Sequence, residues 1–175
     1  MPCHVALSRV LRRLAKADGR VPELARLHNA NDARLRALSA SDAARRGEYD
    51  LLIGFLEGQA EKRPDKTQRR LFLVAVEYEF DDGAKTQGHG DALLVDAAFN
   101  MLVVECKLVR QGACCEQRRT SHVTAQAAKY AARAASWMDH LGRCDPALSS
   151  LLRFSVAPMI LTDLVVPKFN SWVPI

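Results

Sequence analysis

The sequence predicts an α/β fold in which a mixed sheet is flanked by helices. Apolar residues recur at helical spacing up to residue 60 and alternate as in a strand from Leu71 onward. A second long helical stretch then precedes a final apolar run. The predicted order of helix, three strands, helix and strand is that of an α/β sandwich. With 49% hydrophobic and 26% charged residues, the chain of 175 residues is neither wholly disordered nor collagen-like.

Residues 4–46 are rich in Ala, Leu and Arg, and we expect helices there with breaks near residues 19–22 and 29–31. The first sixteen residues are basic and amphipathic, which fits either an organelle transit peptide or a surface helix of the domain. We therefore divide the chain into a basic helical N-terminal extension, residues 1–47, and a domain that carries the α/β core, residues 48–175.

Residues 48–60 form the first helix of the expected core, because apolar side chains fall at helical spacing at Tyr49, Leu52, Ile53 and Leu56. The charged stretch 61–70 contains Pro64 and predicts a loop. A strand is expected over 71–80, and its alternation places on one face Phe72, Val74, Val76, Tyr78 and Phe80.

Residues 91–96 and 101–109 are expected to be the second and third strands, joined closely enough for a hairpin. Residues 111–120 then read as a polar, basic loop. A helix is predicted over 121–141, with Ser121 as its N-cap and Gly142 as its stop. A short helix near 146–152 precedes a last strand, 153–161, in which Pro158 indicates an edge position or a bulge.

Charge is unevenly distributed along the chain. Residues 48–106 hold 12 acidic and 6 basic side chains, whereas residues 107–133 hold 6 basic and 1 acidic. Acidic clusters attract cations and basic clusters attract phosphate. No apolar run approaches the roughly 20 residues that a membrane span needs, so we expect no membrane association.

The five cysteines include no CxxC pair, which indicates free thiols in a reducing, intracellular compartment, either nucleus or cytoplasm unless the N-terminus targets an organelle. A zinc or iron–sulfur site made from these cysteines and His122 would match no established spacing.

The third strand carries two charged residues, Glu105 and Lys107, within an apolar run. Side chains two apart on a strand share a face, and burying both charges is costly unless they pair or meet a metal. The plain alternative is a structural ion pair at the strand end.

The hairpin adds a second acid to this face. If the loop comprises residues 97–99, Asp96 faces Asn100 and Asp91 faces Glu105, with Cβ atoms roughly 4.5–5.5 Å apart. Two carboxylates at that distance repel, and a cation between them relieves the conflict. Oxygen ligands of this kind suit Mg²⁺ or Mn²⁺. A register slip of one residue would move Asp91 to the other face.

Gly90-Asp91, thirteen further residues and Glu105-Cys106-Lys107 resemble the motif of the PD-(D/E)xK nuclease superfamily. The run Gln126-Ala-Ala-Lys-Tyr130 resembles that of its RecB-like clade. The likeness covers roughly residues 48–162 and implies a restriction-endonuclease-like αβββαβ core. Gly90 stands where the motif has proline, and the cysteines do not match the iron–sulfur members of the clade.

The resemblance implies that Asp91, Glu105 and the backbone carbonyl of Cys106 hold Mg²⁺ or Mn²⁺, and that Lys107 is the catalytic lysine. Gln126 and Tyr130, four apart on one helix face, are implied to support the active site and contact nucleic acid. Tyr130 also fits the core stripe of its helix, and Gln126 also fits a solvated position.

The family often adds an acid from the first helix of the core. Glu57 is the candidate and Glu48 the runner-up, and both also fit plain surface positions. On the first strand, Glu77 and Glu79 could also approach the ion. Asp96 is expected to be a turn residue.

Basic side chains around the second helix of the core would hold a phosphate backbone without reading its sequence. They are Arg110, Arg118, Arg119, His122, Lys129 and Arg133. An ordinary flexible basic loop is the alternative interpretation.

By resemblance, then, the chain is a metal-dependent nuclease acting on nucleic acid, with DNA favoured over RNA and a homodimer left open. Two alternatives stay open. One is a catalytically inactive nucleic-acid-binding domain on the same fold. The other is a protein-interaction domain whose N-terminal helices bind a partner.

Overall fold

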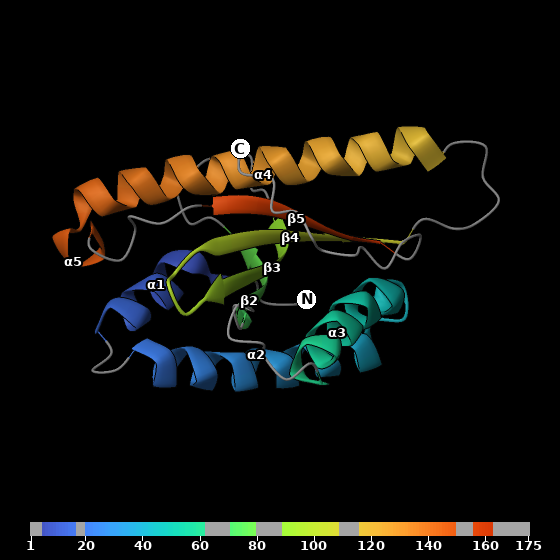
Figure 1. The fold of residues 1–175 in the computed structure, drawn as a ribbon, viewed down its shortest axis with the longest axis horizontal. Helices are drawn as coiled ribbons and strands as arrows, with labels where there is room; N and C mark the ends of the chain where they lie inside the picture. Colours follow the sequence, from blue (N-terminus) through green and yellow to red (C-terminus); the bar gives the residue numbers. More distant parts are fainter. Residues whose placement is uncertain are drawn as a thin grey trace.

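The computed structural model describes residues 5–16, 20–61, 71–79, 89–108, 116–149 and 156–162. Its elements follow the predicted order of helix, three strands, helix and strand, preceded by a short strand and two helices (Figure 1). In chain order they are β1 (Val5–Ala6), α1 (Leu7–Lys16), α2 (Arg20–Ser41), α3 (Arg46–Glu61), β2 (Leu71–Glu79), β3 (His89–Asp96), β4 (Met101–Lys107), α4 (Glu116–Cys144), α5 (Pro146–Ser149) and β5 (Val156–Thr162).

The sheet has five strands in the order β1-β2-β3-β4-β5. The two inner pairs, β2 with β3 and β3 with β4, are antiparallel, whereas β1 and β5 run parallel to their neighbours at the edges. The prediction of a mixed α/β sheet is thereby confirmed. Pro158 lies in the edge strand β5, as its missing amide hydrogen requires.

Helices cover both faces of the sheet, as Figure 1 shows. On one face α1, α4 and α5 bury a core that includes Leu11, Trp137 and Leu148. On the other face α3 buries Tyr49, Leu52 and Leu56 against the strands. Helix α2 contributes to both cores, with Leu24 and Leu27 on the first and Leu35 on the second. Strands covered on both faces read as continuous apolar runs, which is what β3 and β4 show.

The amphipathic N-terminal helix belongs to the folded unit. Leu7, Leu11 and Leu14 of α1 are completely buried in the core that also holds Phe72 of β2. Residues 7–16 therefore pack as a surface helix of the domain, one of the two interpretations that the sequence left open. Among the described helices, none is both long and apolar enough to cross a bilayer.

Helix α2 is continuous through residues 29–31, where the sequence predicted a break. Hydrogen bonds to a distant part of the chain account for this continuity. Asn31 is buried, and its side-chain amide donates to the carbonyl oxygens of Leu27 at 2.9 Å and Val74 at 3.0 Å. His28, one turn earlier, accepts a hydrogen bond through Nδ1 from the amide of Leu73 at 3.0 Å.

Both side chains of α2 form hydrogen bonds with β2 at a point where its pairing with β3 is irregular. The register between β2 and β3 shifts between Leu73 and Ala75, so Val74 is an extra residue. A bulge leaves ladder groups unpaired, and His28 and Asn31 supply partners for them. The prediction that these alternating side chains share one face was wrong. After the shift Val76 joins the α3-side core, away from Phe72 and Val74, and beyond the left-handed Glu77 (φ 49°) Tyr78 lies in the first core again.

We expect Asn31→Ala to lower the free energy of unfolding by about 1–3 kcal/mol, because it leaves the buried Val74 carbonyl without this donor. Chemical denaturation followed by circular dichroism measures the change. Asn29→Ala, at an exposed position of the same helix, is the matched control. Equal losses for the two variants would contradict the proposed bridge.

The β3–β4 hairpin has the loop that the sequence predicted. The Asp96 amide donates to the Asn100 carbonyl at 3.0 Å, and residues 97–99 form the loop. Phe99 adopts a left-handed conformation, with φ 67°. Asp96 is confirmed as a turn residue, since its Oδ1 accepts from the amides of Ala98 and Asn100 at 2.8 and 2.9 Å.

Several predicted boundaries were wrong. Helix α4 begins at Glu116, inside the predicted loop, so Ser121 is an interior residue rather than the N-cap. The helix continues past Gly142 to Cys144, and α3 begins two residues before the predicted start. Propensity marks the middle of an element better than its ends. The predicted loop at 61–70 lies almost wholly outside the described residues.

Candidate functional site

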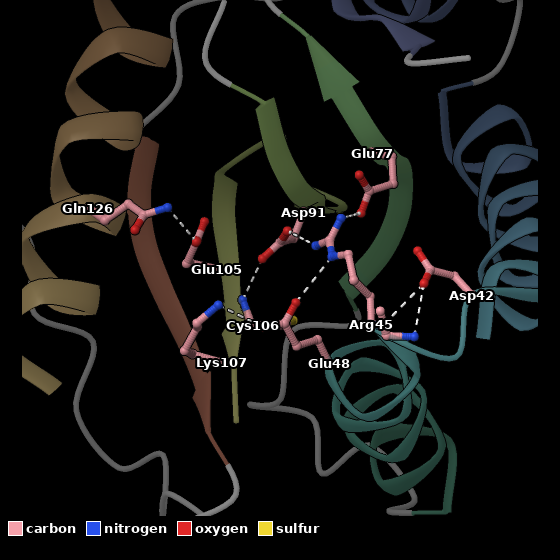
Figure 2. A network of polar contacts seen from close by, with 10 residues as sticks. Asp42, Arg45, Glu48, Glu77, Asp91, Glu105, Cys106, Lys107 and Gln126 are labelled. Atoms are coloured by element: carbon pink, nitrogen blue, oxygen red, sulfur yellow. Dashed lines mark hydrogen bonds and ion pairs between the residues drawn. The ribbon is translucent and has the colours of Figure 1, made fainter. Parts of the chain in front are cut away.

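Three acidic residues align across the three inner strands, near one end of the sheet. The β3–β4 register pairs Ala92 with Val104, and its continuation by one residue sets Asp91 opposite Glu105. The β2–β3 register pairs Val76 with Ala92 and Tyr78 with Gly90, which sets Glu77 opposite Asp91. The hairpin register predicted from the sequence therefore holds in the structure. Figure 2 shows the three side chains with their neighbours.

An arginine that the sequence analysis did not single out lies at the centre of this cluster. Arg45 donates from Nη1 to Glu77 Oε1 at 2.7 Å, from Nη2 to Asp91 Oδ1 at 2.6 Å and from Nε to Glu48 Oε2 at 3.1 Å (Figure 2). One guanidinium thus contacts carboxylates from β2, β3 and α3. It supplies positive charge at the place where carboxylates would otherwise repel one another.

The turn between α2 and α3 fixes Arg45 in this position. Asp42 Oδ1 accepts hydrogen bonds from the backbone amides of Ala44 at 3.1 Å and Arg45 at 3.2 Å. Such an aspartate turn is a common start of a helix, and α3 begins at the next residue. The guanidinium also lies 5.1 Å from the ring centroid of Tyr49, within the range of a cation–π contact.

Lys107 and Glu48 form the second contact between the sheet and α3. Lys107 Nζ lies 2.9 Å from Glu48 Oε1, so the Glu48 carboxylate bridges the ammonium and Arg45. The hydrogen bond that Lys107 donates to Glu48 raises the pKa of Lys107 above its usual value. The amine is therefore protonated at neutral pH and supplies positive charge rather than a base.

Of the two acids considered on the first core helix, the structure brings Glu48, the runner-up, into this cluster and places Glu57, the first choice, elsewhere. Glu57 lies nine residues further along α3, about 13.5 Å at 1.5 Å per residue. Its side chain is 54% exposed and pairs with Arg36 of α2. The sequence did not distinguish the two acids, because helical periodicity alone does not tell which end of α3 lies next to Asp91. Glu79 pairs in register with His89 and lies beyond the cluster.

Glu105 receives its partner from the opposite helical layer. Gln126 Nε2 of α4 donates to Glu105 Oε1 at 2.7 Å (Figure 2). The cluster therefore lies where the layers of α3 and α4 meet across one end of the sheet. Tyr130 lies one turn further along α4, and its side chain is outside the described residues.

Burial and charge crowding act together on the two strand acids. Burial, and after it the neighbouring Asp91, raises the pKa of Glu105 to about 8, against an ordinary value of 4.5. Burial also raises the pKa of Asp91, opposed by the Cys106 amide and by Arg45. Groups with strongly perturbed pKa values of this kind concentrate at functional sites.

Cys106 contacts the acidic cluster through its backbone and not through its thiol. Its amide donates to Asp91 Oδ2 at 2.7 Å. The side chain is buried on the opposite face, where burial and then Asp91 raise the thiol pKa well above its usual value, so the thiol is no nucleophile at neutral pH. Cys106 and Cys144 are both free thiols, whereas the other three cysteines lie outside the described residues.

Glycine at position 90, where the motif has proline, has a steric reason. A Cβ atom built on Gly90 would lie 2.2 Å from Cζ of Tyr78. The Tyr78 ring thus occupies the space next to the residue before Asp91. Gly88, the second glycine of this segment, lies outside the described residues.

The structure describes the predicted phosphate-binding residues only in part. Lys129 is exposed and Arg133 half-buried on α4. The other members either lie on α4 with undescribed side chains, Arg118, Arg119 and His122, or outside the described residues altogether, Arg110. The stretch from Glu116 is helical and not the loop that was predicted.

No group of three or more His, Cys, Asp or Glu side chains in the described ranges is arranged to hold a metal ion. Arg45 gives the local reason, because its guanidinium lies between Glu48, Glu77 and Asp91. Sequence reasoning missed Arg45 because it fell within the predicted N-terminal extension. The Asp42-x-x-Arg45 spacing at the start of α3 was the available signal.

Comparison of the chain with protein-family models, curated proteins and solved structures gives no match.

Proposed function

We propose that the chain is a divalent-metal-dependent nuclease that hydrolyses phosphodiester bonds with a site built on Asp91, Glu105 and Lys107. The observation that carries the proposal is the alignment of Asp91 with Glu105 on neighbouring strands, with Lys107 two residues along the same strand. Together with the resemblance of the motif and of the element order, it favours a restriction-endonuclease-like core.

The donor set fits a hard divalent cation. Asp91 and Glu105 offer carboxylate oxygens, the ligands that Mg²⁺ and Mn²⁺ prefer. Burial, and after it the charge of Asp91, raises the pKa of Glu105, and a cation between the two carboxylates would offset that repulsion. Within the described residues Glu105 Oε2 accepts no hydrogen bond. The Cys106 amide points at Asp91, and the N–H and C=O of one strand residue face the same neighbour, which supports its carbonyl as third ligand.

Residues of the chain would have separate roles in the hydrolysis. A bound ion supplies Lewis acidity and a nucleophilic water of lowered pKa. Lys107, held protonated by Glu48, would stabilise negative charge on the attacked phosphate. Gln126 would orient Glu105 through the bond to Oε1. Arg45 and an ion would compete for Asp91 Oδ1, so ion binding requires the guanidinium to move off that oxygen.

The test is a cleavage assay on single- and double-stranded DNA and RNA with Mg²⁺, Mn²⁺ or EDTA. We expect cleavage with either metal and none with EDTA, with DNA preferred over RNA. Arg143→Ala, which removes an exposed charge paired with Asp139 at the far end of α4, is a control expected to cleave like the wild type. Cleavage that persists in EDTA would refute the proposal.

We expect the affinity for Mn²⁺ to rise about tenfold per pH unit below pH 8 and then level off, because Glu105 must release one proton to bind the ion. The stability of the metal-free protein depends on pH in the opposite direction. Between pH 4.5 and about 8 the folded state keeps a proton that the unfolded state has lost, so the free energy of unfolding falls as pH rises. Calorimetric titration and urea unfolding measure the two trends, and a flat affinity below pH 8 would contradict the role of Glu105.

The ion pair between Arg45 and Asp91 favours a second candidate function, a catalytically inactive nucleic-acid-binding domain. In that case Arg45 is a permanent structural partner of Asp91 and no ion enters. DNA binding without cleavage under any metal condition is the outcome that selects this candidate.

A further inference from the structure

A second charged feature lies far from the acidic cluster, in a hollow of about 700 Å³ between α1 and the start of α2. Five of its eight lining residues are basic and one is acidic. The basic ones are Arg9, Arg12, Arg13, Lys16 and Arg26. The lining therefore carries a net charge of +4, most of the +5 of the whole chain.

The single acid of the hollow organises two of these arginines. Glu23, whose side chain is only 13% exposed, forms an ion pair through Oε1 with Arg13, whose Nε lies 2.7 Å away. Arg26 donates to the same carboxylate through Nη2 at 2.6 Å and Nε at 2.8 Å. Two guanidinium groups are thus brought together, and each has N–H donors that Glu23 does not use. Paired, oriented guanidinium groups match the oxygens of a phosphate.

Of the other three basic residues, one has an acidic partner within the described part of the chain and two do not. Arg12 pairs with Asp145 at 3.4 Å. Arg9 and Lys16 are exposed on α1 and pair with no acid in the described ranges. Since the apolar face of α1 is buried in the core, its basic face is held in a fixed orientation toward solvent. The backbone that carries these side chains is therefore already ordered before an anion binds, so binding requires no folding of the helix.

We propose that this hollow binds the phosphate backbone of nucleic acid. Its lining residues belong to α1 and the start of α2, whereas Arg45 of the acidic cluster follows the other end of α2, where α3 begins (Figure 1). From Glu23 to Ser41 the helix rises about 27 Å, which corresponds to about 8 base pairs at 3.4 Å each. The hollow is a binding surface of its own and requires no cleavage at Asp91, so the two proposals fail independently.

The experiment measures binding of a labelled duplex DNA by fluorescence anisotropy, in EDTA, as a function of salt concentration. The variant is Arg9→Ala/Lys16→Ala, which removes two exposed side chains without a described acidic partner. The matched control is Arg36→Ala/Arg143→Ala, which removes two positive charges that are already paired. Melting temperatures verify that both proteins are folded.

We expect the Arg9→Ala/Lys16→Ala protein to bind duplex DNA about 10- to 100-fold more weakly at moderate salt. The slope of log K against log salt should shrink by about 1.8, since each lost phosphate contact accounts for about 0.9. The control should keep both values. Equal affinity and slope for variant and control would overturn the proposal.

A parallel measurement with phosphatidylserine vesicles distinguishes the other source of phosphate groups. Vesicle binding that is lost in the Arg9→Ala/Lys16→Ala protein while its DNA binding is unchanged would assign the hollow to lipid and overturn the nucleic-acid assignment. If this variant binds DNA more weakly and the wild type cleaves no nucleic acid, the proposal that the hollow binds DNA is supported and the proposed nuclease activity is refuted.

Discussion

Lys107→Ala is expected to lower the rate of metal-dependent cleavage by about 100-fold or more, the scale of losing one well-placed charge-stabilising group. The Lys107 side chain is half-exposed, and the one ion pair that it forms in the described part of the chain is with Glu48, so the protein should fold normally. Single-turnover cleavage under saturating enzyme separates this loss from weaker substrate binding.

Two comparisons make the result interpretable. Arg143→Ala removes a positive charge far from the cluster and should leave the rate unchanged. Lys107→Arg retains the charge and should recover part of the rate, if charge rather than proton transfer is what Lys107 contributes. A Lys107→Ala protein that cleaves as fast as the wild type would exclude this lysine from the site.

Arg45→Met should lower the free energy of unfolding by about 3 kcal/mol, near the lower end for breaking a buried ion pair because Arg45 is partly exposed. The substitution leaves Glu77, with a side chain only 4% exposed, and Asp91 without their shared cation. Urea unfolding measures the loss. Arg36→Met, which removes exposed pairs with Asp32 and Glu57, should cost about 1 kcal/mol.

The same variant distinguishes a metal site from a structural ion pair. If an ion and Arg45 compete for Asp91, Mn²⁺ should raise the melting temperature of Arg45→Met more than that of the wild type, because ligands that bind only the folded state stabilise it. An equal shift in both proteins would show that Arg45 and the ion do not compete.

The sequence alone predicted the part of the site that depends on the hairpin. A three-residue loop sets the register, and the register sets Asp91 opposite Glu105. Alternation then puts Lys107 on the same face as Glu105. These relations are local in the chain, so spacing determines them.

Arg45 and Glu48 could not be predicted in the same way, because they reach the cluster through the packing of α3. Apolar spacing identified the buried face of α3 from Tyr49 and Leu52, but not which of its ends lies beside the strand ends. Glu57 was therefore chosen over Glu48. Glu77 was recognised only as one of several nearby acids, and its left-handed backbone (φ 49°) had no sequence signal.

Long-range hydrogen bonds also overrode local propensity. The Asn29–Asn31 segment has the composition of a helix break, yet Asn31 bonds to Val74 and α2 continues. The bulge at Val74 likewise interrupts an alternation that looked regular along β2. Both features depend on contacts 43 and 45 residues apart in the chain.

The most direct test is the binding of Mn²⁺ itself, measured by calorimetry or by electron paramagnetic resonance on the wild type, Asp91→Asn and Glu105→Gln. We predict one ion bound near pH 8 by the wild type and a loss of that binding in both variants, each of which stays folded by circular dichroism. A wild-type protein that binds no Mn²⁺, or variants that bind it equally well, would contradict the assignment of this cluster as a metal centre.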